Sequence, residues 1–180
     1  NTGIRIGVVT LLQKHFKTIG LEKPTFIGCQ HHILDTLLKH VMNDLFESST
    51  SSPNLHYPFV TRLLQDYENL KLLFRNTGDP LTKVNWIRWR DDMDILHHLI
   101  ACYRKFKSTG TFPKVNFKAL PAISNARWNS RAIFVLLTYI LISDYQESKS
   151  AQAACNFICG SWGDIWFGDH YFNSADFVNL

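Results

Sequence analysis

Basic side chains without acidic neighbours mark the middle of this chain of 180 residues. No Asp or Glu lies between Asp94 and Asp144. A stretch of one charge sign attracts an anionic partner such as a phosphate backbone. The alternative is a solvated basic surface that has no partner. We predict weak, sequence-independent binding of DNA to this stretch. The predicted nucleic-acid-binding residues are Arg104, Lys105, Lys107, Lys114, Lys118, Arg127 and Arg131.

Two segments combine tryptophan with arginine. Residues 86–90 read Trp-Ile-Arg-Trp-Arg, a combination that can stack on bases and bind phosphates. The alternative is a loop whose tryptophans pack against helices while its arginines stay exposed. Arg127 lies in the first turn of a helix predicted to begin at Ser124, where the helix dipole disfavours a cation. We expect Arg127 to meet a carboxylate or a phosphate, or to cover a buried Trp128.

Cys29 and His32 have a Cys-x-x-His spacing that suits two zinc ligands. The candidates for a second pair are His97, His98, Cys155 and Cys159. Adjacent histidines on one helix diverge by about 100°, and no contiguous pattern of four ligands is present. We therefore predict no metal site. A buried Cys29 and a hydrogen-bonded His32 at a junction of two elements is the preferred interpretation.

Motifs of nucleotide binding and of nucleophilic catalysis are absent from the sequence. It contains no Gly-x-Ser-x-Gly, no Walker loop and no Gly-x-Gly-x-x-Gly. Asp91, Asp92 and Asp94 cluster where a predicted helix begins, a placement that the helix dipole alone explains. A hydrolase that uses His97 or His98 would lack a nucleophile motif. We assign no catalytic residue to this chain.

Apolar residues recur at every third and fourth position in several segments, which predicts helices. These segments are residues 4–18, 30–47, 59–74, 91–107, 124–142 and 149–158. Residues 24–28 form a short β-branched and aromatic run between Pro and Gly, which predicts a buried strand. The polar run at residues 47–53 predicts a flexible linker. The predicted domains are residues 1–47, a linker at 48–56, and a helical region at 57–180.

Composition indicates a globular protein with one sizeable core, because 46% of the residues are hydrophobic and 19% are charged. Four cysteines are too few for a disulfide scaffold, which favours a reducing, intracellular compartment, nuclear or cytoplasmic. The most apolar stretch, residues 132–142, is about half as long as a membrane span, so we predict no membrane segment. Because residue 1 is Asn and the first residues lack the pattern of a secretory signal, we expect a truncated chain.

Two segments together resemble one protein family. Cys29 and His32, with the apolar run Ile33-Leu34-Asp35-Thr36-Leu37-Leu38 after them, resemble the Cys-x-x-His segment and helix of hAT-type transposases. Arg127-Trp128-Asn129-Ser130 resembles the Arg-Trp signature that comes later in those proteins. The opening Asn1-Thr2-Gly3 is similar to the residues directly after their second catalytic aspartate. The resemblance covers about residues 1–47 and 120–142.

This resemblance implies the fold class and the origin of the chain. It implies a predominantly helical α+β fragment, in which residues 1–47 form part of an RNase H-like core (helix, strand, helix) and an all-helical insertion comes next. An active parent would hold divalent metal ions, Mg²⁺ or Mn²⁺, on an acidic triad and would cut and join DNA strands. The full-length protein could form a homo-oligomer. No residue of this sequence matches that triad, so the fragment itself is expected to be non-catalytic. The alternative is a domesticated, non-catalytic helical module that binds DNA or protein.

Overall fold

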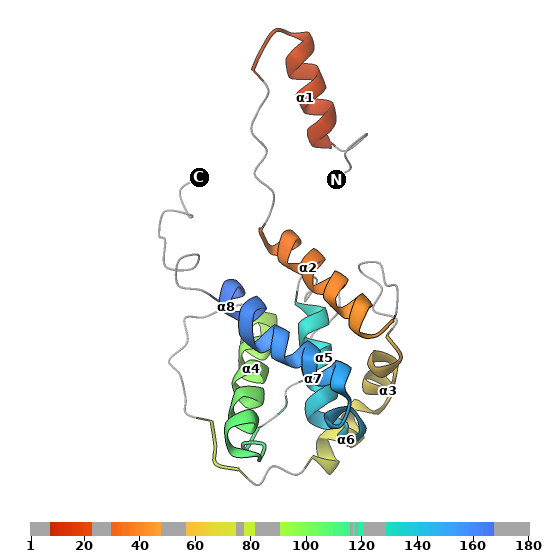
Figure 1. The fold of residues 1–180 in the computed structure, drawn as a ribbon, viewed down its shortest axis with the longest axis vertical. Coiled ribbons are helices and arrows are strands. Elements are labelled where there is room, and N and C mark those ends of the chain that lie inside the picture. The colour runs from red at the N-terminus through yellow and green to blue at the C-terminus, as the bar shows by residue number, and fades with distance from the viewer. Residues whose placement is uncertain are drawn as a thin grey trace. The chain divides into compact units, whose positions relative to one another are not determined.

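The computed structural model describes residues 8–22, 30–47, 57–74, 78–81, 91–115, 117, 119–120 and 129–167. The chain forms two compact units, Asn1–Gln30 and His31–Leu180 (Figure 1). Within the described ranges no strand is present, and the only β-type pairing is an isolated bridge between Pro80 and Lys114. The predominantly helical class is confirmed, whereas no RNase H-like core is seen in these ranges. The predicted strand at 24–28 and the linker at 48–56 lie outside them.

The described part of the first unit is a single amphipathic helix, α1 (Val8–Thr18). Its last turn is closed by Thr18, whose hydroxyl donates to the carbonyl oxygen of His15 at 2.6 Å. The chain then turns at Gly20, whose φ of 74° suits a residue without a side chain. The helix predicted over residues 4–18 is confirmed from Val8 onward.

The second unit is a bundle of helices. Its elements are α2 (Gln30–Leu45), α3 (Pro58–Leu73), α4 (Asp91–Thr109), α5 (Ser130–Leu141), α6 (Ser143–Gln146), α7 (Lys149–Phe157), the π-helix η1 (Ile158–Trp162) and α8 (Gly163–Trp166). The apolar repeats predicted five of these helices, α2 to α5 and α7, with ends shifted by a few residues. They did not predict α6, η1 or α8, which are each only four or five residues long.

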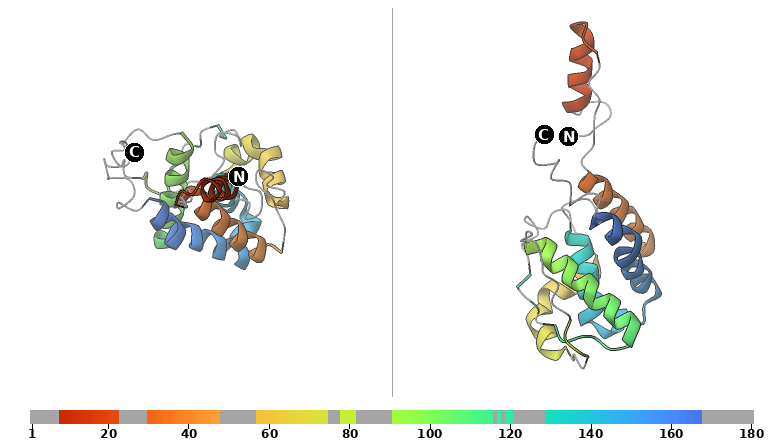
Figure 2. Two further views of the ribbon diagram at one scale, coloured as in Figure 1. Left: turned by 90° about the horizontal axis from the view of Figure 1, so that it is seen from above. Right: turned by 90° about the vertical axis from the view of Figure 1, so that its left-hand side faces the viewer.

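Helix α5 is the centre of the bundle. All of its residues, Ser130–Leu141, are buried. A helix that is apolar on nearly every side must be enclosed by others, and α5 contacts α3, α4 and α7. Figure 2 shows α4 running across α5 when the bundle is seen from the side. Any side chain on α5 is therefore removed from solvent, whatever its polarity.

Aromatic rings join the end of α2 to the start of α3. Tyr57 and Phe59 stack with ring centroids 5.1 Å apart, and Phe46 lies 4.8 Å from Phe59. The hydroxyl of Tyr57 donates to Oδ1 of Asn43 at 3.0 Å, which satisfies the polar end of a buried ring. Pro58 comes next, at the first position of α3, where a missing N–H costs nothing. These contacts tie α2 to the rest of the bundle.

The segment from α7 to α8 is helical but kinked. Ser148 caps α7 by accepting a hydrogen bond from the backbone N–H of Ala151 at 3.3 Å. Gly160, inside η1, leaves helical geometry with φ −101° and ψ −113°. At Gly163 an added Cβ would lie 2.5 Å from the carbonyl oxygen of Ile158, so the close turn requires glycine. This kink brings the backbone of η1 against α4.

Candidate nucleic-acid interface

Arg131 forms a buried ion pair with Asp35. Its Nη1 lies 2.6 Å from Oδ1 of Asp35, and the two side chains are 1% and 4% exposed. The prediction that Arg131 contacts DNA is therefore wrong for this fold, because α5 lies at the centre of the bundle and carries the guanidinium inward. The Nε and Nη2 atoms of Arg131 are buried and have no hydrogen-bond partner among the residues that the structure describes. Burial raises the pKa of the Asp35 carboxyl, and the neighbouring Arg131 only partly offsets this rise.

Further buried polar contacts surround this pair. The amide of Asn129, which is fully buried, donates to Oδ2 of Asp92 at 2.9 Å. Trp162 in η1 donates from its indole nitrogen to the carbonyl oxygen of Leu34 in α2 at 3.0 Å. Asp92 is thus a buried hydrogen-bond acceptor. The sequence explains its position only by the favourable interaction of a carboxylate with the start of a helix. Helices α2, α4, α5 and η1 are joined here by polar bonds as well as by apolar packing.

The segments of the family resemblance meet at this junction as far as they are described. Cys29, Arg127 and Trp128 lie outside the described residues, as does the tryptophan-arginine segment at 86–90. His32 is described, and it is exposed on α2. Asn129, which comes directly after Trp128, is buried against α4. The Cys-x-x-His helix and the start of α5 therefore belong to one polar core of the bundle.

Helix α4 and the segment after it carry the exposed basic side chains. Arg104, Lys107 and Lys114 are exposed and Lys105 is half-buried, whereas Lys118 lies outside the described residues. In the part of the chain that the structure describes, no ion pair joins Lys105, Lys107 or Lys114 to a carboxylate. Binding of an external anion by these ammonium groups stays a prediction from the one-signed stretch.

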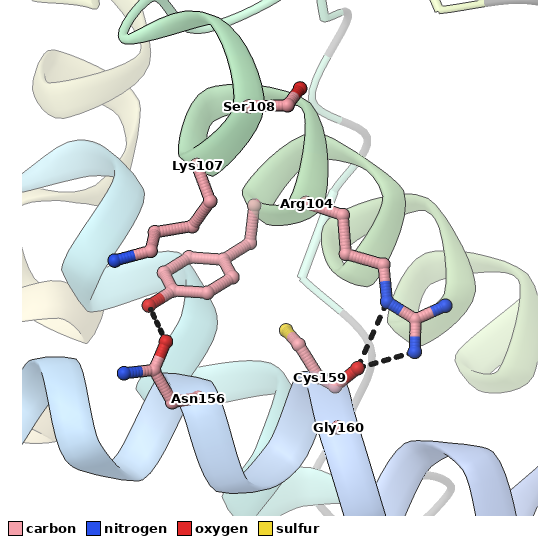
Figure 3. Close-up of a pocket in the computed structure, with 7 residues that line it drawn as sticks. Arg104, Lys107, Ser108, Asn156, Cys159 and Gly160 are labelled. Carbon is pink, nitrogen blue, oxygen red and sulfur yellow. Dashed lines mark hydrogen bonds between the residues drawn. The ribbon is translucent and has the colours of Figure 1, made fainter.

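A depression of about 430 Å³ lies between α4 and the junction of α7 with η1 (Figure 3). We call it the α4–η1 pocket. Its lining residues are Tyr103, Arg104, Lys107, Ser108, Asn156, Cys159 and Gly160. Arg104 and Lys107 are three residues apart on α4, which places both on one face of the helix. The pocket therefore has two cationic side chains at its rim.

Arg104 is bound at one side of the pocket. Its Nε donates to the carbonyl oxygen of Cys159 at 2.9 Å, and its Nη2 donates to the same oxygen. The same Nη2 lies 2.6 Å from Oδ1 of Asp164, with the arginine side chain 53% exposed. Backbone carbonyls near the end of a helix carry partial negative charge, so a guanidinium is stabilised at the kink. Arg104 thus links α4 to η1 and α8.

Tyr103 and Asn156 fix the opposite side. The Tyr103 hydroxyl donates to Oδ1 of Asn156 at 2.7 Å. Burial raises the pKa of Tyr103, so the phenol keeps its proton and stays a donor. The oxygen of the Asn156 amide is therefore engaged, and its NH₂ group offers two donors. In Figure 3 the Lys107 ammonium and the Asn156 amide lie on the same side of the pocket, away from Arg104.

The cysteines of the bundle are buried thiols. Burial raises the pKa of Cys102 and of Cys159 to about 12, and raises that of Cys155 as well. A protonated thiol is a poor nucleophile and a poor metal ligand. Burial also lowers the pKa of His97 to about 4. Among the described residues, no three His, Cys, Asp or Glu side chains are grouped so that they could hold a metal ion.

Sequence reasoning found the cationic rim of the pocket but missed its other polar groups. Arg104 and Lys107 belong to the predicted basic stretch. Asn156 and Asp164 come about fifty residues later, carry no motif, and are brought to α4 only by the packing of η1. No signal in the sequence pairs them with α4. The kink that exposes the Cys159 carbonyl likewise arises from two glycines whose effect depends on tertiary packing.

Comparisons with protein-family models, with curated proteins and with solved structures give no match to this chain. Among the helices that are described, none has the length and apolar character required to cross a bilayer.

Proposed function

We propose that this chain is a non-catalytic helical module of a transposase-like protein that binds DNA through the exposed basic residues of α4 and the segment after it. The observation that carries this proposal is the set of ammonium groups at Lys105, Lys107 and Lys114, which make no ion pair within the described residues. An ammonium without a carboxylate partner can neutralise a phosphate, and each neutralised phosphate releases counterions. The described residues contain no groove-reading motif, so the proposed binding is independent of sequence.

The link to transposases rests on the resemblance and is supported by the buried Asp35–Arg131 pair. Asp35 lies three residues after His32, and Arg131 lies directly after the Arg-Trp-Asn-Ser segment. The two segments are about a hundred residues apart, yet one ion pair of 2.6 Å joins the helices that contain or adjoin them. Through this ion pair, both segments help to join α2 to α5. The ion pair supports the interpretation that they belong to one family pattern. The proposal that residues 1–47 are part of an RNase H-like core rests on the resemblance alone.

The divalent metal of an active parent does not fit the two carboxylates that are buried in the described part of the bundle. Asp35 is engaged by Arg131, and Asp92 accepts a hydrogen bond from Asn129. Both are buried, so neither can join a pair of metal ions that must also reach DNA. The proposed module therefore contributes binding surface and positioning. Strand cleavage and transfer would belong to residues of the parent beyond those described.

A protein-binding module is the second candidate. Leu72 and Leu73, at the end of α3, are 84% and 74% exposed. Adjacent exposed leucines are more typical of a contact with another protein than of a contact with DNA. This candidate predicts that the chain leaves DNA unbound at low salt.

The test is the salt dependence of duplex DNA binding, measured by fluorescence anisotropy with two unrelated duplexes of about 20 base pairs. The logarithm of the binding constant falls linearly with the logarithm of the salt concentration. Replacing Lys105, Lys107 and Lys114 by Gln should make this negative slope shallower by about 2 to 3, since each phosphate contact contributes roughly 0.9 to its magnitude. A matched control changes Lys14, Lys17 and Lys149, which are also exposed, to Gln. Equal slopes for the two triple variants would refute the assignment of the binding surface. Absence of binding at low salt would favour the protein-binding candidate.

A further inference from the structure

We propose that the α4–η1 pocket is a subsite for the phosphate of an unpaired nucleotide, so that the chain prefers single-stranded to duplex DNA. The inference rests on the proposed DNA binding and adds the group that the pocket recognises. The residues that would hold the phosphate are Lys107 and Asn156. Of the predicted nucleic-acid-binding residues that are described, Arg104 and Lys107 line this pocket.

The Asn156 amide is oriented by a hydrogen bond from Tyr103. Tyr103 donates its hydroxyl to Oδ1 of Asn156, so the amide NH₂ is directed away from that bond. The Lys107 ammonium lies on the same side of the pocket (Figure 3). A phosphate oxygen placed between them would receive one charge-assisted bond and one amide bond. A fixed amide donor costs little entropy when it binds, whereas a free surface side chain must first be ordered.

The other side of the pocket is less suited to an anion. Asp164 lies 2.6 Å from Nη2 of Arg104, and the Cys159 carbonyl oxygen lies 2.9 Å from its Nε. These acceptors offset the positive charge of Arg104 and engage its Nε and Nη2 donors. The phosphate is therefore assigned to the Lys107 and Asn156 side. The Arg104 side is left for the sugar or the base of the same nucleotide.

The shape of the pocket favours an unpaired nucleotide over a duplex. The phosphates of a duplex have a regular, stiff path, whereas a single strand can turn one nucleotide into a recess. At Gly160 an added Cβ would meet no atom within 4 Å, so this position leaves the pocket open. The thiol of Cys159 beside it stays protonated, because burial raises its pKa to about 12, and it therefore does not repel a phosphate. The volume of about 430 Å³ lies within the range of small-ligand sites.

The experiment compares Asn156→Asp with Asn69→Asp in the full chain. Asn69 is an exposed residue of α3, so its replacement adds the same negative charge away from the pocket. Asp at position 156 still accepts the Tyr103 hydrogen bond but replaces two donors by an anion. Anisotropy is measured with a fluorescent eight-nucleotide oligothymidine and with a duplex. We expect Asn156→Asp to weaken oligothymidine binding about ten-fold more than it weakens duplex binding, whereas Asn69→Asp should weaken the two to the same small extent.

Two further measurements distinguish a loss of binding from misfolding of the variant. Thermal melts of both variants are compared with the wild type, and Asn156→Ser replaces Asn156→Asp if the latter melts early. In the wild type, NMR spectra should show the side-chain amide of Asn156 shifting on addition of thymidine monophosphate. If the two Asp variants weaken oligothymidine binding equally, or if the Asn156 amide signal does not shift, the phosphate subsite is refuted while the proposed duplex binding still stands. Loss of all DNA binding in the wild type would overturn both proposals.

Discussion

The buried ion pair offers the sharpest test of this fold. Asp35 and Arg131 lie 2.6 Å apart with side chains 4% and 1% exposed. Replacing one partner leaves the other charge buried, which costs about 3–5 kcal/mol. We expect Arg131→Met and Asp35→Asn each to lower the free energy of unfolding by about 3 kcal/mol or more. For a chain of this length that corresponds to a fall in Tm of about 6–12 °C.

The two variants should differ in their dependence on pH. Burial already raises the pKa of Asp35 above its ordinary value, so the folded state binds this proton more readily than the unfolded state. The stabilisation contributed by that proton is complete below pH 3.8 and is lost as the pH rises through the folded pKa. In Arg131→Met the carboxyl loses its cation, and the pKa rises further. The penalty of Arg131→Met should therefore shrink as the pH falls from about 7.5 to about 5. The penalty of Asp35→Asn should not shrink, because this variant leaves a permanent arginine charge and lacks the carboxyl whose protonation stabilises the wild type.

Urea denaturation monitored by tryptophan fluorescence at about pH 5 and about pH 7.5 measures both effects. The double variant Asp35→Leu with Arg131→Met serves as the control. It removes both charges, and Nε and Nη2 of Arg131 have no hydrogen-bond partners to lose within the described part of the chain. The stability of the double variant should therefore lie within about 1 kcal/mol of the wild type or above it. A loss below about 1 kcal/mol in Arg131→Met, or the same pH dependence in the two single variants, would refute a buried, charged pair.

Two further predictions concern η1 and α4. Trp162→Phe should lower the free energy of unfolding by about 2–3 kcal/mol, because the fully buried indole loses its bond to the Leu34 carbonyl and leaves a cavity. Trp166→Phe should cost less in the same urea denaturation, because the indole of Trp166 donates to the sulfur of Met93, a weaker acceptor than a carbonyl. Burial lowers the pKa of His97 to about 4, so the unfolded chain takes up this proton between pH 6.5 and 4 while the folded chain does not. Stability at about pH 5 should therefore be about 1 kcal/mol lower than at about pH 7 through this group, and His97→Gln should remove that part of the pH dependence.

The helices of the bundle could be predicted because their apolar residues repeat with the helical period. The stripe in α4, with Leu96, Leu99 and Tyr103, is buried as the repeat requires. The segment from residue 158 to 166 could not be predicted in the same way. Gly160 and Gly163 interrupt the period, and the kink between them is stabilised by α4 rather than by local sequence. Short elements of this kind depend on tertiary contacts more than on propensity.

For the candidate site, the sequence could predict only which residues carry positive charge. A count of basic residues along the chain cannot say how deep each one lies. Lys107 and Arg131 belong to the same basic stretch, yet Lys107 is exposed and Arg131 is 2% exposed. A lone arginine at the start of a long apolar run is a sign of a buried partner, and Asp35, between Leu34 and Leu38 in the buried stripe of α2, is the matching sign. Asn156 gives no such sign, because an amide adds neither charge nor periodicity.

The depth of these residues separates stabilisation from binding. Arg131 and Asn129, next to the segment that resembles the Arg-Trp signature, use their polar atoms to hold α2, α4 and α5 together. Few polar atoms of this buried junction therefore remain to bind an external ligand. Helix α4 instead divides its residues between two sides: Tyr103 enters the core while Arg104 and Lys107 stay at the surface. Because Tyr103 also orients Asn156, packing within the bundle determines which donors the pocket offers. Binding by this module should therefore be sensitive to core substitutions at Tyr103 as well as to the loss of surface charge.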